Sequence, residues 1–277
     1  MIGAIHIMGI VNLTPDSFYA KSRAGADVLP RIASMLAEGA DVIDLGACST
    51  RPGSPQPSLE EEWARLEPAL TEIAGYTPSE TCAPPHMGRG VYPAISVDTY
   101  RAEIVRRTYD IIGPFMVNDI SAGQLDPEML PTVGRLGLPY VAMHMRGTPV
   151  NMQQFTDYSP DVATEVVRYF KEFDKKAQDN GIENWLLDPG FGFSKTLAQN
   201  YELLWRMEEL QVLGKEILVG VSRKSMIYKV LGITPEEALE ATQTVQYAAL
   251  ARGATWLRVH DVAPAVKTAL RFIQEKC

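Results

Sequence analysis

The sequence predicts a single-domain α/β fold, a (β/α)8 TIM barrel of eight parallel strands with helices outside. Eight short apolar segments alternate with longer amphipathic ones, about 35 residues per repeat, which suits a barrel of this length. The apolar segments show little polar/apolar alternation, which is typical of strands buried on both faces in a parallel sheet. The whole chain, 1–277, is therefore expected to form one domain.

Each expected strand is followed by an amphipathic segment, and the last of these, 262–277, would be the final helix. A doubly wound open sheet is the alternative fold. No G-x-G-x-x-G motif follows the first strand, as the dinucleotide-binding form of that fold requires. The expected strands are 5–12, 41–46, 93–98, 114–119, 139–144, 184–188, 216–221 and 255–260.

Several helix ends can be predicted from local residues. Ser58 before three glutamates indicates a capped helix start, and so does Thr234 followed by Pro235. Gly39 and Gly253 stand just past expected helices, as C-terminal capping glycines do.

One segment interrupts the regular pattern. Residues 76–93 are rich in Pro, Gly and polar side chains and lie between an expected helix and the third strand. We interpret this segment as an inserted surface loop at the end of the barrel opposite the active site, which serves either contacts or no function.

Composition narrows the function classes. The net charge is -8 and the basic residues form no stripe, so no nucleic-acid partner is expected. No apolar run is long enough to cross a bilayer and no basic signal start is present, so we expect no membrane partner and a cytoplasmic location. Cys48, Cys82 and Cys277 are far apart and the histidines lack zinc spacing, which predicts free thiols and no zinc site.

The segment 186–196, LLDPGFGFSKT, resembles a phosphate-binding P-loop at first sight. That motif needs Gly directly before the Lys and another five positions earlier, where this chain has Ser194 and Pro189. Asp188 also ends the apolar run, and its carboxylate would repel a phosphate. The segment is better explained as an acid at a strand end, followed by a Gly-rich turn into a helix.

Polar residues end nearly every expected strand. In a TIM barrel, the carboxyl ends of the strands surround the active site. One strand-end Asp is often only a helix cap, but eight strands that end this way indicate a polar pocket. The residues are Asn12, Ser49, Thr50, Arg51, Asp98, Asn118, His144, Asp188, Ser222, Arg223, Lys224, Arg258 and His260.

Two chemically different sets can be distinguished among these residues. Carboxylates, an amide and an ammonium suit a flat heterocycle that has N–H donors and a carbonyl. Arginines, a hydroxyl and a histidine suit phosphate oxygens, and an Asn oxygen beside phosphate can hold Mg²⁺. The first set is Asp98, Asn118, Asp188 and Lys224; the second is Asn12, Thr50, Arg51, Arg258 and His260.

Eight motifs at the strand ends together resemble dihydropteroate synthases, a pterin-binding TIM-barrel family. They occur in the order of that family and extend from residue 5 to about 272. Each motif alone would be weak evidence, whereas eight in order are strong. They are GIVNLTPDSF (9–18), STRPGS (49–54), ISVDTYRAEI (95–104), VNDISAG (117–123), MHMRGTP (143–149), DPGFGFSKT (188–196), GVSRKS (220–225) and RVHDV (258–262).

The resemblance implies an enzyme of folate biosynthesis. It would condense 6-hydroxymethyl-7,8-dihydropterin diphosphate with 4-aminobenzoate and release 7,8-dihydropteroate and pyrophosphate. It implies Mg²⁺ as the cofactor, a homodimer, and a target of sulfonamides. We expect a dissociative, SN1-like substitution without a covalent enzyme intermediate, because an aromatic amine that attacks a cation hardly needs a base.

The resemblance also implies roles for individual residues. The residues that would bind the pterin are Asp98, Asn118, Met143, Asp188 and Lys224. Those that would bind the diphosphate are Asn12, Thr50, Arg51, Arg258 and His260. Pro52, Phe193, Lys224 and Ser225 would border 4-aminobenzoate, Asn12 would bind the metal, and the catalytic residues would be Asp98, Lys224, Arg258 and His260. Asp16 could join the acids around the developing cation.

Two stretches depart from the family pattern. SFYAKSRAGA (17–26) replaces Ser-Phe-Ser-Asp-Gly-Gly, and Gly46, Ala47 and Cys48 replace Gly-Gly-Glu. Cys48 has no neighbouring base, so we interpret it as a small residue and not as a nucleophile. Closure of 13–26 and 47–57, and sulfonamide sensitivity, are left open.

Two other functions are compatible with a pterin-binding barrel. A corrinoid-dependent methyltetrahydrofolate methyltransferase would have no diphosphate or aminobenzoate for 49–54 and 222–225 to bind. A non-catalytic pterin-binding paralogue would be expected to lack Asn12, Arg51 or His260, and all three are present. The outer helix expected over 235–253 could form a dimer face, or could simply pack on the barrel.

Overall fold

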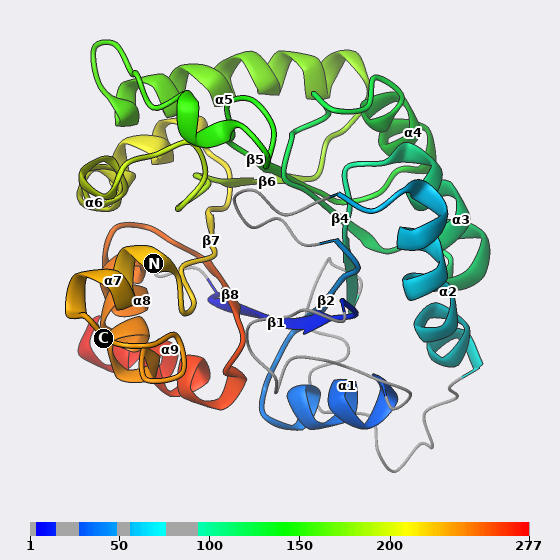
Figure 1. The fold of residues 1–277 in the computed structure, drawn as a ribbon, viewed down its shortest axis with the longest axis horizontal. Coiled ribbons are helices and arrows are strands. Elements are labelled where there is room, and N and C mark those ends of the chain that lie inside the picture. Colours follow the sequence, from blue (N-terminus) through cyan, green and yellow to red (C-terminus); the bar gives the residue numbers. More distant parts are fainter. Residues whose placement is uncertain (1–3, 15–27, 49–55, 76–93, 277) are drawn as a thin grey trace.

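Eight parallel strands form one sheet that closes into a barrel, as predicted (Figure 1). The computed structural model describes residues 4–14, 28–48, 56–75 and 94–276. The strands pair in the order β6-β5-β4-β3-β2-β1-β8-β7, and a single parallel bridge from Leu187 to Ile217 joins β6 to β7. The strands are β1 (His6–Asn12), β2 (Val42–Gly46), β3 (Ile95–Asp98), β4 (Met116–Asp119), β5 (Tyr140–Met143), β6 (Trp185–Asp188), β7 (Leu218–Val219) and β8 (Trp256–Val259).

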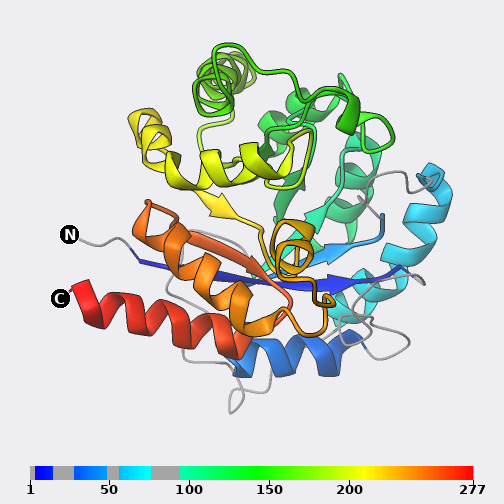
Figure 2. The same ribbon diagram turned by 60° about the vertical axis from the view of Figure 1, so that its left-hand side comes forward.

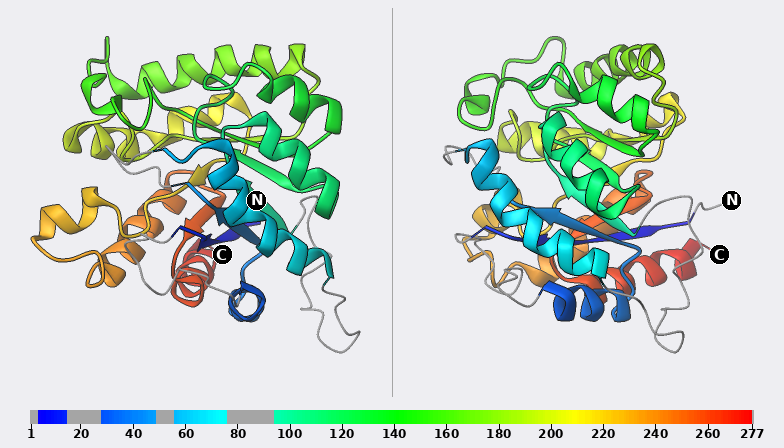
Figure 3. Two further views of the ribbon diagram at one scale, coloured as in Figure 1. Left: turned by 45° about the vertical axis from the view of Figure 1, so that its right-hand side comes forward. Right: turned by 90° about the vertical axis from the view of Figure 1, so that its right-hand side faces the viewer.

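Helices surround the barrel, and α1 and α9 lie side by side along β1 (Figures 2 and 3). Their bounds are α1 (Val28–Ala37), α2 (Leu59–Gly75), α3 (Ala102–Ile112), α4 (Met129–Leu136), α5 (Val162–Asp179), α6 (Leu197–Trp205), α7 (Ser225–Leu231), α8 (Leu239–Ala251) and α9 (Val262–Lys276), with short 3-10 helices η2 (Met152–Gln154) and η3 (Met207–Leu213). None of the helices in the described part of the chain is both long and apolar enough to span a bilayer.

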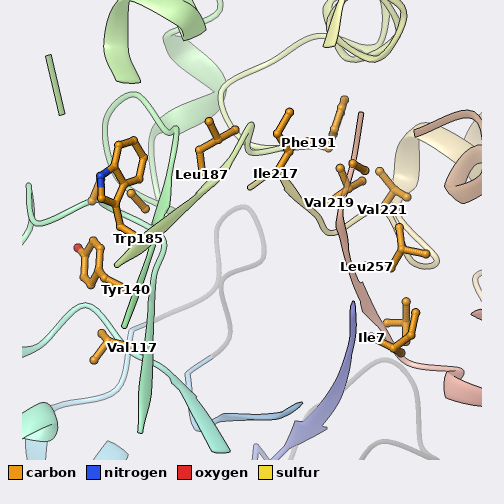
Figure 4. Packing of buried hydrophobic residues seen from close by; sticks show 14 of the residues in the cluster. Ile7, Val117, Tyr140, Trp185, Leu187, Phe191, Ile217, Val219, Val221 and Leu257 are labelled. Carbon is orange, nitrogen blue, oxygen red and sulfur yellow. The ribbon is translucent and has the colours of Figure 1, made fainter. Parts of the chain in front are cut away.

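The main core lies between the strands and the surrounding helices. Outward-facing strand residues such as Val117, Leu187 and Leu257 point toward the helices and are completely buried (Figure 4). This burial on the outer face explains why the strands read as continuous apolar runs.

A second, smaller apolar layer fills the barrel interior, and His6 stacks on its member Trp256 with 4.4 Å between ring centroids. Side chains alternate between the two faces of a strand, so residues two positions beyond this layer also face the interior. The layer consists of Met8, Val42, Met116, Val141, Leu186, Leu218 and Trp256. Two positions further along the chain stand Ile10, Asp44, Asn118, Met143, Asp188, Gly220 and Arg258, most of them polar. The polar side chains therefore lie directly above this apolar layer, which we call the apolar floor.

The predicted helix start at Ser58 is confirmed. Ser58 N–H donates to the Glu61 carboxylate at 2.7 Å, and Glu61 N–H donates to Ser58 Oγ at 3.2 Å, which closes a capping box. The C-terminal glycines are confirmed as well, with φ of 105° at Gly39 and 100° at Gly253, in the region that glycine adopts without strain.

The predicted helix start at Thr234 is wrong. Thr234 and Glu237 make the same reciprocal contacts, at 2.9 and 3.4 Å, but the segment is a turn and α8 begins at Leu239. The guanidinium of Arg223 donates to the carbonyls of Pro235 and of the next residue at 2.6 and 2.7 Å, which holds the turn in place. The predicted insertion at 76–93 lies outside the described residues.

Candidate functional site

Four polar side chains from four strands meet above the apolar floor. Arg258 on β8 donates from Nε to Asp44 Oδ2 at 2.7 Å and from Nη2 to Asp98 Oδ2 at 2.8 Å. Asn118 on β4 donates from Nδ2 to the same Asp44 oxygen at 3.1 Å. The structure therefore brings together three predicted site residues and one that was not predicted, Asp44.

The charges in this cluster are strongly perturbed by burial. Burial raises the pKa of the Asp98 carboxyl to about 7, with Arg258 acting to lower it and Asp44 to raise it. Burial lowers the pKa of Arg258, but the two carboxylates outweigh that effect and leave this pKa above its usual value. Arg258 is thus a cation, while Asp98 is poised to gain or lose a proton near neutral pH.

Asp188 and Lys224 form the second half of the site, at the ends of β6 and β7. Asp188 Oδ1 accepts the Gly190 N–H at 2.8 Å, so the Gly-rich turn holds the carboxylate at the strand end, as predicted. Lys224 Nζ donates to the Phe191 carbonyl and lies 4.7 Å from the centre of the Phe193 ring. Burial lowers the pKa of Lys224 to about 8 against the attraction of Asp188, and burial raises the pKa of Asp188 against that of Lys224.

Two glycines leave space between these groups. A Cβ at Gly46 would lie 3.6 Å from Asn12 Oδ1 and 3.8 Å from Asp98 Cβ. A Cβ at Gly220 would lie 3.9 Å from both Arg258 Cβ and an Asp188 oxygen. An added methyl group would make ordinary contacts at either position, so these glycines are not needed for packing. They keep the space between the polar side chains open.

An apolar wall borders the polar groups. Met143 and Phe193, both predicted to line the site, belong to one buried cluster with Ile120, Met145 and Met152. The Lys224 ammonium over the Phe193 ring connects this wall to the charged side. A flat ring that enters here would meet hydrogen-bonding groups at its edge and apolar side chains on its face.

His260 lies beside Ser222 at the end of β8. Ser222 Oγ accepts the His260 backbone N–H at 3.2 Å and lies 3.1 Å from Nδ1. The hydroxyl and the ring nitrogen are thus within hydrogen-bond distance, and the ring is held against Ser222. Burial, followed by the cation of Arg258, lowers the pKa of His260 to about 3, so the ring is neutral at pH 7.

The predicted metal ligand, Asn12, ends β1 with its Oδ1 near the space at Gly46. Within the described residues, no cluster of three or more His, Cys, Asp or Glu side chains could hold a metal ion. One amide oxygen suits a Mg²⁺ ion that takes its other oxygen ligands from phosphate and water, as this metal often does.

Some predicted residues cannot be placed. Thr50, Arg51 and Pro52 lie outside the described residues, as does Asp16. Ser225 is the first residue of α7, directly after Lys224.

Two strand-end residues of the predicted polar pocket do not face it. Arg223 has φ of 53°, and its side chain donates to Asp261 at 2.8 and 3.1 Å. His144 is buried outside the polar cluster, with its Nδ1 2.9 Å from Lys195 Nζ. Both residues therefore hold turns together and do not line the site.

Lys195 also explains why 186–196 resembles a P-loop without being one. Its buried Nζ donates to the carbonyls of Gly190 and Phe193 at 3.0 and 3.1 Å, so it ties the turn to itself. Thr196 caps α6 in a reciprocal capping box with Gln199.

A buried cluster supports the segment after β2. Glu62 is completely buried, accepts Thr99 Oγ1 at 2.7 Å and pairs with Arg101. Arg101 also lies 3.8 Å from Cys48 Sγ. Burial, followed by the charge of Glu62, raises the pKa of the Cys48 thiol, which agrees with our interpretation of Cys48 as a residue that is not a nucleophile.

Sequence reasoning missed Asp44 because it treated β2 as a core strand. The available signal was a single acid within an otherwise apolar strand, VIDLG. Buried acids need a partner, so such an acid indicates a charged neighbour from another strand.

Known proteins are similar to this chain in sequence and in structure. The model of the pterin binding enzyme family matches residues 8–260. Dihydropteroate synthase of Escherichia coli K12 is 38% identical over 273 residues, which cover 97% of this chain and 90% of the relative. The enzyme of Neisseria meningitidis serogroup C is 41% identical, with 92% and 87% covered.

Solved structures of this family are also similar to this chain. Dihydropteroate synthase of Yersinia pestis, in a sulfonamide drug complex, superposes with a TM-score of 0.87 at 34% identity and covers 99% of this chain and 94% of that one. The Xanthomonas albilineans enzyme with 4-aminobenzoic acid gives 0.83 at 34% identity, with 100% and 94% covered. This chain therefore belongs to the dihydropteroate synthases, the pterin-binding enzymes of folate biosynthesis.

Proposed function

We propose that this chain joins a reduced pterin diphosphate to 4-aminobenzoate with Asp98, Asn118, Asp188 and Lys224 as its pterin site. The observation that carries this proposal is the convergence of these side chains above the apolar floor, beside the space left at Gly220. The carboxylates would accept ring N–H groups, the amide would both donate and accept, and the ammonium would donate to the ring carbonyl or a ring nitrogen. Met143 would pack on the ring face.

The diphosphate would bind next to the pterin, toward β1 and β8. Arg258 supplies a fixed cation, and the neutral ring of His260 would supply a hydrogen-bonding group. Thr50 and Arg51 would complete this set. The donor set suits Mg²⁺, held by Asn12 and by oxygens of the diphosphate, and when bound the ion would neutralise charge on the leaving group.

The arrangement supports a dissociative reaction. As the methylene C–O bond breaks, the bond electrons leave with the diphosphate, whose growing negative charge Arg258 and His260 would stabilise. The remaining cation would lie near Asp98 and Asp188, which are aligned before the reaction begins. The amine of 4-aminobenzoate then attacks the methylene and loses a proton to solvent. Asp98, Lys224, Arg258 and His260 are the catalytic residues of this proposal.

The second substrate would bind nearer the mouth of the barrel. Phe193, Lys224 and Ser225 border the region beyond the pterin groups, and we place Pro52 there as well. The Xanthomonas albilineans relative was solved with 4-aminobenzoic acid and the Yersinia pestis relative with a sulfonamide. We infer that this chain binds both kinds of molecule at the same place.

A homodimer is the oligomeric state that the surface supports. Large apolar side chains are exposed on α6, η3 and α7, and Figure 1 shows α6 and α7 on the same side of the barrel. Such a patch is typical of a protein–protein interface. Light scattering after gel filtration should give twice the chain mass of 30.6 kDa. The residues are Leu197, Trp205, Val212, Val230 and Leu231. The cytoplasmic location stays a prediction.

The function is tested by pyrophosphate release from the reduced pterin diphosphate, with and without Mg²⁺ and 4-aminobenzoate. Release that needs both, together with formation of dihydropteroate, is the expected result. Methyl transfer from methyltetrahydrofolate would favour the methyltransferase alternative. Pterin binding without any release would favour a non-catalytic paralogue.

A further inference from the structure

Asp44 occupies an unusual place for an acid. It is the middle residue of β2, with no exposed surface, and its strand neighbours are apolar or glycine. It lies in register with Ile10 on β1 and Ser96 on β3, which carry no charge. The charge that compensates it must therefore come from a strand that does not pair with β2.

That compensation comes from two site residues on different strands. Arg258 reaches Asp44 Oδ2 from β8 through Nε at 2.7 Å and Nη2 at 2.6 Å, and Asn118 reaches the same oxygen from β4 at 3.1 Å. One carboxylate oxygen thus fixes the guanidinium plane and the amide orientation together. An amide whose nitrogen is held in this way presents its oxygen in a defined direction.

Asp44 also affects how Arg258 is shared. Nη2 of Arg258 contacts both Asp44 and Asp98, so the two acids compete for one cation. Without Asp44, the guanidinium would pair with Asp98 alone and occupy the carboxylate needed for the pterin. The other Asp44 oxygen, Oδ1, is buried and has no hydrogen-bond partner in the described part of the chain. An acid present only for stability would be expected to have both oxygens paired.

We propose that Asp44 is a positioning residue of this enzyme, which holds Arg258 and Asn118 in place for the pterin diphosphate without touching the substrate itself. The proposal rests on the roles proposed above for Arg258 and Asn118. It assigns a function to an acid in the interior of a strand, in the same layer of side chains as Asn118 and Arg258.

The test is Asp44→Asn, which keeps the volume and removes the charge. We expect kcat/KM for the pterin diphosphate to fall about 10–100-fold, as is usual when a supporting partner is removed. The KM for 4-aminobenzoate should change less than about twofold, because no residue assigned to that substrate contacts Asp44. Ser96→Ala is the matched control: Ser96 is the register neighbour of Asp44, equally buried, and its Oγ also lacks a partner among the described residues. Its kinetics should equal those of the wild type.

A double-mutant cycle with Arg258→Met separates positioning from general support of the fold. If Asp44 acts mainly through Arg258, adding Asp44→Asn to Arg258→Met should lower kcat/KM by less than about threefold further. The double variant removes both charges of the Asp44–Arg258 pair, so neither of these charges is left buried without the other. Wild-type kcat/KM in Asp44→Asn, full additivity in the cycle, or an equal rise of both KM values would each overturn the proposal.

Failure of the proposed function would look different. In that case the wild type itself would release no pyrophosphate, whatever residue 44 is. Calorimetric titration with 6-hydroxymethylpterin, which has no diphosphate, would still test Asp44, because Asn118 should hold the ring less tightly in Asp44→Asn. Unchanged pterin affinity there would contradict the proposal independently of turnover.

Discussion

Two buried aspartates, on the two faces of the barrel wall, are satisfied in opposite ways. Asp44 faces the interior and shares one oxygen among long-range partners, while its other oxygen has none in the described part of the chain. Asp119, at the end of β4, faces outward and accepts from Ser121 N–H and Oγ at 2.7 Å, from Gly123 N–H at 2.8 Å and from Tyr140 Oη at 2.6 Å.

The difference teaches how to separate a structural acid from a functional one. Asp119 accepts hydrogen bonds from four neutral donors, three of them within its own turn, so it stabilises the local conformation of the chain. Asp44 is held mainly by a cation that a substrate would also use. Asn118 and Asp119 are adjacent, yet strand alternation sends one to each region. We call the polar side chains above the apolar floor, including Asp44, Asp98 and Lys224, the pocket floor, and the turn around Asp119 the outer turn. Mutations in the pocket floor should therefore lower activity, and mutations in the outer turn should lower stability.

The largest expected effect is on the pocket floor. Lys224→Met removes the buried ammonium that we propose as a catalytic group, and kcat/KM for the pterin diphosphate should fall about 10²–10³-fold. The thermal midpoint should stay near that of the wild type, because a desolvated charge is lost as well. Steady-state kinetics and calorimetry on one preparation would check both. If this variant were unstable but fully active per folded molecule, the expected division between activity in the pocket floor and stability in the outer turn would be wrong.

The outer turn should show the converse. Asp119→Ala leaves several buried donors without an acceptor, and the free energy of unfolding should fall by about 3 kcal/mol. Urea denaturation measures this loss. The kcat/KM of the remaining folded protein should stay within a few-fold of the wild type; a selective hundredfold loss would mean that Asp119 belongs to the site.

The pH dependence should also originate in the pocket floor. Asp98 must be ionised to accept N–H groups, and its raised pKa makes kcat/KM fall about tenfold per pH unit below about 7. Lys224 must be protonated to donate, so a second decline is expected above about 8. Asp98→Asn should abolish the acidic decline and Lys224→Arg the alkaline one.

The same carboxyl links pH to stability. Asp98 binds its proton more tightly when folded than when unfolded, so its stabilising contribution is complete below about pH 4 and is lost as the pH rises through about 7. The stability difference between the wild type and Asp98→Asn should change in that window.

The smallest effect tests a single bond of the outer turn. Tyr140→Phe removes one of the four donors to Asp119 and should lower the free energy of unfolding by about 1 kcal/mol. Activity should be unchanged. A larger cost would indicate that the Tyr140 hydroxyl, and not the turn, carries most of the stabilisation of Asp119.

Much of this arrangement could be predicted from the sequence. The eight strands followed from apolar runs at regular spacing, and the convergence of Asp98, Asn118, Asp188 and Lys224 followed from barrel topology, which brings strand ends together. These features depend on patterns that are local or that the fold class enforces.

The remaining features depend on contacts between distant segments. Arg258 lies within β8 and Arg223 follows β7, but the left-handed backbone at Arg223 directs its side chain to Asp261. The same side chain donates to backbone carbonyls just after Thr234 and holds a turn where the first turn of a helix was expected. Asp44 was hidden because its partners are more than seventy positions away in the sequence.

The apolar layer under the site also affects the order in which substrates can bind and leave. Trp256 and its neighbours fill the barrel below the polar side chains and close the site on that side. In the proposed site, a pterin bound against Asp98 and Asn118 would lie deeper than an aminobenzoate near Phe193. The pterin would then bind first, and it would leave only after the aminobenzoate has left or has been joined to it.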